Sequence, residues 1–322
     1  MKGNAITLRV VLAAAALLVL PAALYAQREV REYAVPAGSH PHDVAPAPDG
    51  RVWYTAQHRA ALGWLDPKTG KTGEIALGRG SRPHGVIIGP AGDLWVTDGG
   101  LSAIVRVDPV TEEVTRYRLP ASRANANLNT GTFDKNGNYW FTGQAGIYGR
   151  VNPATGEVET FDAPRGRGPY GIDASVDGYV YYASLAAGYV GRIDPADGSV
   201  TVLGPPESRQ GTRRIWADSR GVLWVSAWYG GVLYRLVPER NEWEAVSLPG
   251  SGNRPYGLYV DNRDMVWISD FGTNAIYRYN PEEKIFQTYA LPSRGAGVRQ
   301  LLGRPGEVWG AESGTDKLVV IR

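Results

Sequence analysis

Short runs of apolar residues alternate with turns along most of the chain, and one stretch shows the pattern clearly. Residues 86–88 form an apolar run, a turn follows at Ala91-Gly92, and a second run ends at Trp95-Val96. Two such runs joined by a glycine-containing turn predict a β-hairpin. His84 and Asp98 stand equally far from the middle of this turn. The pattern therefore predicts that they face each other at the open end of the hairpin.

The hairpin recurs along the chain, and an aromatic residue marks the second strand of each copy. Successive marks are 41 to 45 residues apart. A period of this length with several strands per repeat is typical of propeller blades. The 41 glycines and 22 prolines fit the many turns that such blades need. The sequence thus predicts an all-β, seven-bladed β-propeller over residues 27–322. The marks are Trp53, Trp95, Trp140, Tyr181, Trp224, Trp267 and Trp309.

The last repeat lacks a strand, and the start of the mature chain supplies a candidate for it. The seventh unit ends after its third strand, at residues 317–321. Residues 29–36 read like residues 284–292, which form the fourth strand of the sixth unit. We therefore expect residues 29–35 to pair into the last blade and close the ring, which protects the edges of the propeller.

The first residues indicate export. A basic start precedes an apolar run over residues 10–20, and Pro21 and then a segment Ala-Leu-Tyr-Ala that ends at Ala26 follow. This is the pattern of a secretory signal peptide over residues 1–26, so we expect the mature chain to begin near Gln27 in the periplasm or outside the cell. Leu24 is not a small residue, so an uncleaved anchor is the alternative.

Charge and cysteine content exclude several classes of function. The chain has 34 basic and 32 acidic residues, and the expected signal peptide holds two of the basic ones, which leaves 34 − 2 = 32 against 32. A balanced mature chain argues against a nucleic-acid partner. The chain has no cysteine, so disulfides, thiolate metal sites and thiol nucleophiles are excluded.

In a propeller the first strand of each blade lines the central channel. The position eleven before each mark should then form a ring at one end of the channel: His42, His84, Asn129, Tyr170, Arg213, Tyr256 and Val298. The position three after each mark should form a second ring: Ala56, Asp98, Gly143, Ser184, Ala227, Asp270 and Glu312. Adjacent blades would gather His42, His84, Asp98, Asp270 and Glu312, opposite a wall that includes Tyr170, Tyr256, Trp228, Tyr229 and Phe271. Such an arrangement predicts a site for a small molecule.

The same residues have a structural interpretation as well. Polar residues at blade tops also cap strand ends or hydrate a channel. We expect His40 and His58 to be surface loop residues. Arg82 and Arg254 either bind an anionic group or pair with neighbouring acids, and the second interpretation is favoured.

Several motifs together resemble one enzyme family. Arg-Pro-His-Gly-Val at 82–86, Trp-Val-Thr-Asp at 95–98 and Pro-Tyr-Gly-Ile/Leu at 169–172 and 255–258 resemble the streptogramin B lyase (virginiamycin B lyase) family. The resemblance covers residues 28–322. It implies a propeller enzyme that opens a cyclic depsipeptide by elimination at its ester, in which Mg²⁺ polarises the substrate and a histidine removes a proton.

The resemblance also implies roles for individual residues. His42 resembles the first histidine of the family's site, His84 its base and Asp98 its late carboxylate. Arg82 stands where the family has another carboxylate, so a hard oxygen ligand of Mg²⁺ is missing. Glu312 would replace that ligand if it reaches the site.

Three functions stay open at this point. The first is a lyase acting on a cyclic ester or lactone. The second is a non-catalytic periplasmic propeller that binds a peptide, glycan or protein. The third is a lactonase like gluconolactonase, with a divalent metal on Asp98, Asp270, Glu312 and Asn129. We expect a monomer that binds a small molecule or cyclic peptide at the channel mouth, with no nucleic acid and no membrane contact beyond a signal anchor. Its substrate-binding residues would be Arg82, Tyr170, Tyr256 and Asp270.

Overall fold

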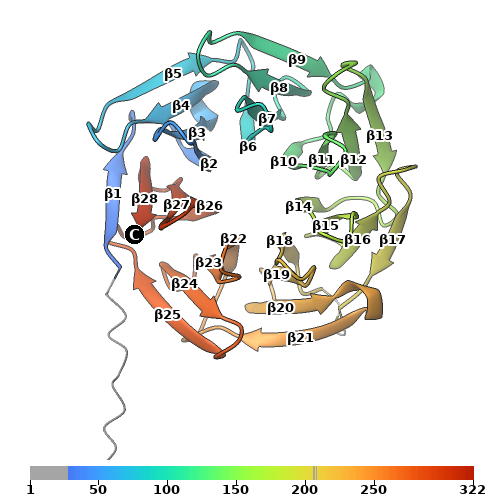
Figure 1. Ribbon diagram of the computed structural model, residues 1–322, viewed down its shortest axis with the longest axis vertical. Coiled ribbons are helices and arrows are strands. Elements are labelled where there is room, and N and C mark those ends of the chain that lie inside the picture. Colours follow the sequence, from blue (N-terminus) through green and yellow to red (C-terminus); the bar gives the residue numbers. More distant parts are fainter. Residues whose placement is uncertain (1–27, 206, 208) are drawn as a thin grey trace, which may run out of the picture.

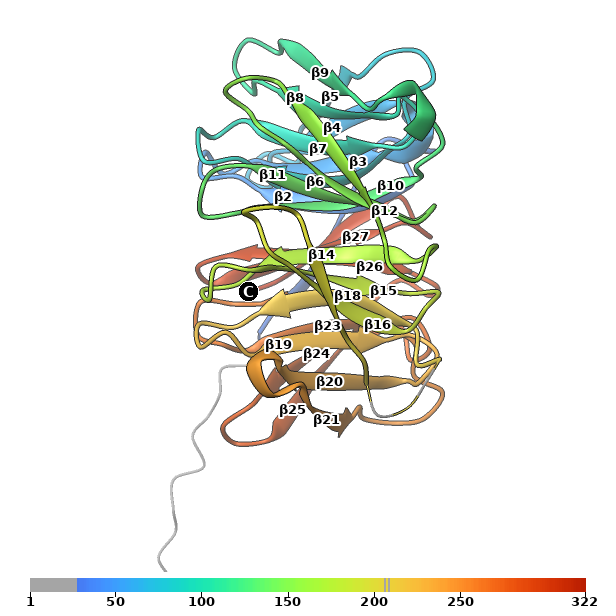
Figure 2. The same ribbon diagram turned by 90° about the vertical axis from the view of Figure 1, so that its right-hand side faces the viewer.

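Seven four-stranded antiparallel sheets surround a central channel, as Figure 1 shows in a view along that channel. The structure is a computed structural model that describes residues 28–205, 207 and 209–322. Figure 2 shows the ring from the side. The predicted seven-bladed propeller is confirmed. The predicted signal peptide, residues 1–26, lies outside the described residues. None of the helices in the described ranges has the length and apolar composition that a membrane crossing needs.

The strands occupy the same four positions in every blade. The innermost strands are β2 (Pro41–Pro46), β6 (Pro83–Ile88), β10 (Leu128–Phe133), β14 (Pro169–Ala174), β18 (Thr212–Ala217), β22 (Pro255–Val260) and β26 (Val298–Arg304). The second strands are β3 (Val52–Ala56), β7 (Leu94–Asp98), β11 (Tyr139–Gly143), β15 (Val180–Ser184), β19 (Leu223–Ala227), β23 (Val266–Asp270) and β27 (Glu307–Glu312). The third strands are β4 (Ala61–Leu65), β8 (Ala103–Val107), β12 (Ile147–Val151), β16 (Tyr189–Ile193), β20 (Val232–Val237), β24 (Ala275–Asn280) and β28 (Lys317–Ile321).

The outer strands are β5 (Thr72–Ala76), β9 (Val114–Arg118), β13 (Val158–Asp162), β17 (Val200–Leu203), β21 (Glu242–Ser247), β25 (Ile285–Ala290) and β1 (Val30–Ala34). Three short 3-10 helices lie between strands: η1 (Gln57–Arg59), η2 (Ala121–Arg123) and η3 (Pro238–Arg240).

The N-terminal strand closes the ring as predicted. Strand β1 pairs with β28 over its whole length, from Val30 opposite Ile321 to Ala34 opposite Lys317. The two strands lie side by side in Figure 1. The Glu32 carboxylate accepts hydrogen bonds from Lys317 Nζ (2.6 Å) and from the Ser293 hydroxyl (2.7 Å). Both the strand ladder and this polar contact therefore hold the last blade to the start of the chain.

The aromatic marks join each blade to the next. All six tryptophan marks are at most 2% exposed. Trp95, for example, lies in a buried cluster with Tyr139 and Phe141 of the third blade, and its ring centroid is 5.2 Å from that of Tyr139. Equivalent clusters join the other blades, so apolar burial between sheets holds the inner strands around the channel.

A β-bulge at the channel end of every inner strand changes the predicted register. In the second blade Pro83 pairs with Asp98, and the next pair is Val86 with Val96, so two residues oppose one. His84 is one of those two residues. The prediction that His84 and Asp98 face each other is therefore wrong, because the bulge turns the histidine toward the channel.

Hydroxyl groups on the second strands fix the bulged residues in place. Thr55 Oγ1 donates a hydrogen bond of 2.8 Å to the carbonyl oxygen of His84 in the next blade, and it accepts one of 3.0 Å from the Asp43 backbone N–H. The same bridge recurs from Thr97 to Asn129, from Thr142 to Tyr170 and from Ser226 to Tyr256. The ring residues at the channel end are thus anchored from both sides.

Candidate functional site

Two histidines from neighbouring blades meet at this end of the channel. The ring centroids of His42 on β2 and His84 on β6 are 3.7 Å apart, and the ring planes are tilted by 44°. Both side chains are buried, with 3% and 8% of their surface exposed. The structure therefore brings together the two residues that the sequence singled out as catalytic candidates.

Hydrogen bonds assign the protons of His42. Its Nδ1 lies 2.7 Å from Asp43 Oδ1, and Arg214 Nη2 donates to the same oxygen at 3.0 Å. Arginine has no acceptor, so Asp43 accepts from both neighbours and we place the proton on His42 Nδ1. The unprotonated Nε2 then lies 3.5 Å from the Tyr256 hydroxyl.

A second chain of hydrogen bonds assigns the protons of His84. Arg214 Nη1 donates to Thr130 Oγ1 (2.6 Å), and that hydroxyl donates to Asn129 Oδ1 (2.7 Å). Asn129 Nδ2 is then a donor, and it lies 3.1 Å from His84 Nε2. We therefore place the lone pair of His84 on Nε2 and its proton on Nδ1, a buried atom with no partner within the described ranges.

Both histidines are held in the neutral form. Burial lowers the pKa of His42 well below its usual value, and the nearby guanidinium groups of Arg299 and Arg214 lower it further. Burial likewise lowers the pKa of His84, and the adjacent His42 adds to the effect. A neutral imidazole is the form that accepts a proton.

Two tyrosines and two arginines complete the ring. The hydroxyl groups of Tyr170 and Tyr256 share a hydrogen bond, and Arg213 Nη2 donates to the Tyr170 hydroxyl at 2.9 Å. Arg299 Nη1 donates to the Tyr256 hydroxyl at 3.3 Å. Burial acts to raise the pKa of Tyr256, but Arg213, Arg214 and Arg299 outweigh it and lower that pKa. Burial raises the pKa of Tyr170, so Tyr256 is the more acidic of the two.

The ring position in the seventh blade was predicted wrongly. Val298 lies in the buried apolar cluster with Trp267, and Arg299 contacts the ring instead. The reason is a shorter hairpin. Leu302 pairs with Trp309, seven positions apart, whereas Ile87 pairs with Trp95, eight positions apart.

The sequence interpretation also missed the residues directly after the ring positions, namely Asp43, Thr130 and Arg214. A signal was available, because three other blades have glycine at this position: Gly85, Gly171 and Gly257. A Cβ at Gly85 would come within 2.7 Å of the Asn129 carbonyl oxygen. A polar residue at a position that is packed this closely, where other blades have glycine, is therefore a candidate for the site.

The predicted metal ligand Asp98 is turned away from the histidines. Its Oδ1 accepts hydrogen bonds from the backbone N–H groups of Arg82 (2.9 Å), Gly100 (3.0 Å) and Leu101 (2.9 Å), and its Oδ2 accepts one from Ser81. The residue is fully buried. Asp98 therefore caps the loops at the top of its own blade.

The other two carboxylates have similar structural partners. Asp270 accepts hydrogen bonds from the backbone N–H groups of Arg254 (3.0 Å) and Thr273 (2.9 Å). Glu312 accepts one from Thr315 Oγ1 at 2.7 Å, and burial raises its pKa to about 7. Within the part of the chain that the structure describes, the one group of three histidine or acidic side chains close enough to share a metal is His42, Asp43 and His84.

This group does not fit magnesium. Mg²⁺ prefers an octahedral shell of oxygen ligands. Asp43 offers the one carboxylate of the three, and its Oδ1 already binds Arg214 and His42. The guanidinium groups of Arg213, Arg214 and Arg299 surround the histidines and oppose a further cation. The carboxylates expected for the lactonase, Asp98, Asp270 and Glu312, do not form such a group within the described ranges either.

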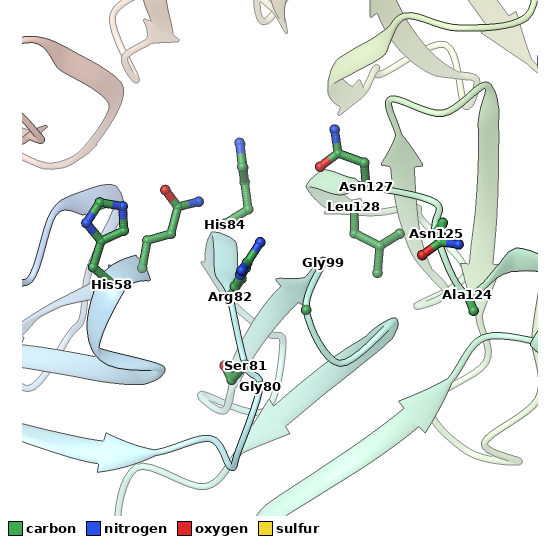
Figure 3. A pocket seen from close by; sticks show the side chains of 12 residues that line it. His58, Gly80, Ser81, Arg82, His84, Gly99, Ala124, Asn125, Asn127 and Leu128 are labelled. Carbon is green, nitrogen blue, oxygen red and sulfur yellow. The ribbon is translucent and has the colours of Figure 1, made fainter.

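A cavity of about 870 Å³ lies above the first three blades, and we call it the mouth pocket (Figure 3). His84 and Arg82 both line it, and in Figure 3 both side chains point into the open space. None of the described residues that line the pocket carries a carboxylate, and its polar side chains include Gln57, His58, Asn125 and Asn127. His58 stacks on His40, with ring centroids 4.2 Å apart. His58 is exposed, as expected for a surface loop residue, and it also contributes to a wall of the pocket.

The aromatic wall forms only in part. Tyr256 stacks on Phe271 with centroids 4.8 Å apart, and Trp228 meets Tyr256 edge-on at 5.7 Å. Tyr229 is 59% exposed and lines a separate cavity of about 320 Å³ beside Arg254. The expectation that the arginines before the ring pair with acids is wrong, since neither Arg82 nor Arg254 forms a salt bridge to any residue in the described ranges.

Comparisons with known proteins agree with this architecture. A solved streptogramin B lyase is 22% identical, with a TM-score of 0.84, and the match covers 92% of this chain and 97% of that one. Virginiamycin B lyase from Staphylococcus aureus, in a catalytically inactive histidine-to-alanine form with quinupristin, is 21% identical, with a TM-score of 0.84 over 92% and 99% of the two chains.

More distant propellers share the fold alone. The extracellular domain of a hybrid two-component system from B. thetaiotaomicron is 16% identical, with a TM-score of 0.70 over 91% of this chain and 42% of that one. No curated protein sequence gives a significant match. The model of the virginiamycin B lyase family matches residues 21–279, and the chain therefore belongs to that family.

Proposed function

We propose that this chain is a carbon–oxygen lyase that opens a cyclic ester or depsipeptide by elimination, with His84 as the general base. The observation that carries the proposal is the oriented histidine pair beside the mouth pocket. His84 lines that pocket, and its neutral ring has the lone pair on Nε2. In the free chain this atom accepts a hydrogen bond from Asn129, and in the reaction it would exchange that donor for the substrate proton. Family membership supports the same reaction class.

The proposed step conserves atoms and electrons. His84 Nε2 takes a proton from the carbon next to the ester-bearing carbon, and the C–H electron pair becomes a C=C bond. The C–O bond breaks and its electron pair leaves with the carboxylate. Asp43, which holds His42 next to His84, lies close enough to favour the imidazolium that forms, because its charge raises the pKa of His84.

A specific observation favours a second candidate, a propeller that binds its ligand without turning it over. The metal ligands that the family resemblance implies are not available at this site, because Asp98 caps loops and an arginine occupies position 82. In that case the mouth pocket would hold a peptide or glycan while the histidine pair only closes the channel.

The experiment that separates the candidates is a product analysis. The purified chain is incubated with quinupristin and with simpler cyclic esters, and the products are analysed by mass spectrometry. Elimination gives an unsaturated product of unchanged mass, whereas hydrolysis adds one water. The lyase proposal predicts ring opening without added water. Binding without any product would favour the second candidate.

A matched pair of variants assigns the base. His84→Ala should lower turnover by about 10²–10⁴-fold while thermal melting stays close to that of the parent. His40→Asn is the control, because His40 lies outside the mouth pocket and asparagine tolerates its positive φ of 46°. Equal activities of the two variants would remove His84 from the mechanism.

We also propose that residues 1–26 direct export, on the sequence pattern alone. N-terminal sequencing of the protein from a periplasmic fraction should start near Gln27, and an intact Met1 in the cytoplasm would contradict export.

A further inference from the structure

The guanidinium of Arg82 is a positive charge without an acidic partner among the described residues. Its backbone N–H donates to Asp98, which fixes the loop just before the strand. Its side chain is exposed and forms neither a salt bridge nor a hydrogen bond with any residue that the structure describes. In Figure 3 the side chain points into the mouth pocket beside His84.

The surroundings of Arg82 favour an anion. Among the residues that the structure describes, no aspartate or glutamate lines the mouth pocket, while the imidazole of His58 and the amides of Asn125 and Asn127 offer further polar contacts. The closest carboxylate in the sequence motif, Asp98, is buried and saturated by four donors. A guanidinium binds a carboxylate through two parallel N–H···O bonds, so this cation is suited to a carboxylate ligand.

The sixth blade has the same Arg-Pro-x-Gly motif, but the guanidinium of its arginine is hydrogen-bonded. Arg254-Pro255-Tyr256-Gly257 repeats Arg82-Pro83-His84-Gly85, and the Arg254 backbone N–H is bound by Asp270 as that of Arg82 is by Asp98. The Arg254 guanidinium, however, donates to the Trp228 carbonyl oxygen at 3.4 Å. An unpaired arginine beside a histidine is therefore a property of the second blade.

We propose that Arg82 binds the carboxylate group of the ligand, and that in the reaction this is the carboxylate that leaves when the ester opens. The second half of this inference rests on the proposed lyase function. Elimination puts the electron pair of the broken C–O bond on a carboxylate oxygen, and a guanidinium at that oxygen stabilises the charge as it develops. The cation of Arg82 then takes the place of the metal that the family resemblance implies.

Binding is tested without any substrate. Sodium acetate is titrated into the ¹⁵N-labelled full chain at constant ionic strength, with sodium chloride as the reference salt, while the arginine Nε–Hε and histidine ring signals are followed by NMR. Acetate should shift the signals of Arg82 and His84 with a saturable curve. Arg82→Gln should abolish the response of His84, and Arg254→Gln should leave it intact. An acetate response that equals the chloride response, or that survives in Arg82→Gln, would overturn the inference.

Steady-state kinetics tests whether Arg82 binds the carboxylate that leaves in the reaction. Arg82→Gln should lower kcat by about 10²–10³-fold, with a smaller loss in Arg82→Lys, because the lysine keeps the charge but loses the two-point contact. If acetate binds at Arg82 but the chain opens no ester, the lyase function is contradicted and the anion site is supported. If Arg82→Gln leaves turnover unchanged, the lyase function is supported and the role of Arg82 at the leaving carboxylate is contradicted. Circular dichroism of each variant checks the fold.

Discussion

The second and sixth blades share the same backbone arrangement at the start of the inner strand and differ in the side chains that this backbone carries. In both, an Arg-Pro-x-Gly segment enters the inner strand, and an aspartate at the end of the second strand, Asp98 or Asp270, accepts the N–H of the arginine. The second blade presents His84 and a free guanidinium, while the sixth presents Tyr256 and a guanidinium bound to a carbonyl. The repeated residues therefore build the blade, and the residue that changes inside the repeat is the one to which we assign the proposed chemistry.

This comparison explains why a shared motif does not transfer every role. The late acidic position of the family motif is filled here by Asp98, but Asp270 fills the same position in a blade without a histidine. An aspartate that caps loops in both blades has a role in folding, and its presence in the second blade therefore does not indicate catalysis. His84 has no such counterpart, since the sixth blade holds a tyrosine there.

The largest effect should come from making the two blades alike. His84→Tyr gives the second blade the ring residue of the sixth, and turnover should fall by about 10²–10⁴-fold because the imidazole that would take the proton is lost. Initial rates on the substrate identified by mass spectrometry measure this. Activity within a few-fold of the parent would show that the difference between the blades is not catalytic.

A smaller but still large effect should follow from Asp43→Asn, which breaks the connection between the two sides of the channel. Arg214 would lose its salt bridge with Asp43 and remain a buried, uncompensated charge. The expected loss in the free energy of unfolding is about 3–5 kcal/mol, measured by urea denaturation. Asp49→Asn is the control, because Asp49 pairs with Arg51 at the surface, and its loss should be below about 1 kcal/mol. Equal losses in the two variants would contradict the role of Asp43.

The two capping aspartates should respond alike. Asp98→Ala and Asp270→Ala each leave backbone N–H groups without their acceptor, and each should cost about 1–3 kcal/mol of unfolding free energy. Calorimetry with MgCl₂ should show no binding by the parent. Magnesium binding that is lost in Asp98→Ala and kept in Asp270→Ala would instead make Asp98 a ligand and separate the blades at this position.

The smallest effect concerns Glu312 in the last blade. Burial raises its pKa to about 7 from an ordinary 4.5, with Glu32 and Lys317 as the charged neighbours. The folded chain therefore holds this proton more tightly than the unfolded chain, so stability falls as the pH rises from 4.5 to about 7. Glu312→Gln should remove this fall. Its melting temperature should exceed that of the parent by about 2–4 °C at pH 8 and match it at pH 4. Parallel curves at all pH values would contradict the assignment.

The fold was predictable because its signals are local and repeated. Each blade carries its own aromatic mark and apolar alternation, and the strand missing after Ile321 is visible as a match at residues 29–36. The ring positions followed by counting from the marks. Counting failed in the seventh blade, where the hairpin between Leu302 and Trp309 is one residue shorter.

The site was less predictable for physical reasons. A β-bulge leaves the apolar pattern of a strand unchanged, so the sequence paired His84 with Asp98 although the bulge separates them. Arg214 reaches Asp43, 171 residues away, across the channel. Contacts of this kind depend on how the ring closes, and no local pattern encodes them.

The most direct test of the central idea is ring opening in the presence of excess EDTA. A neutral histidine acting with a guanidinium predicts that the full chain still opens its ester under these conditions, with an unsaturated product of unchanged mass. Loss of turnover in EDTA, with recovery on addition of MgCl₂, would contradict it and restore the metal to the site.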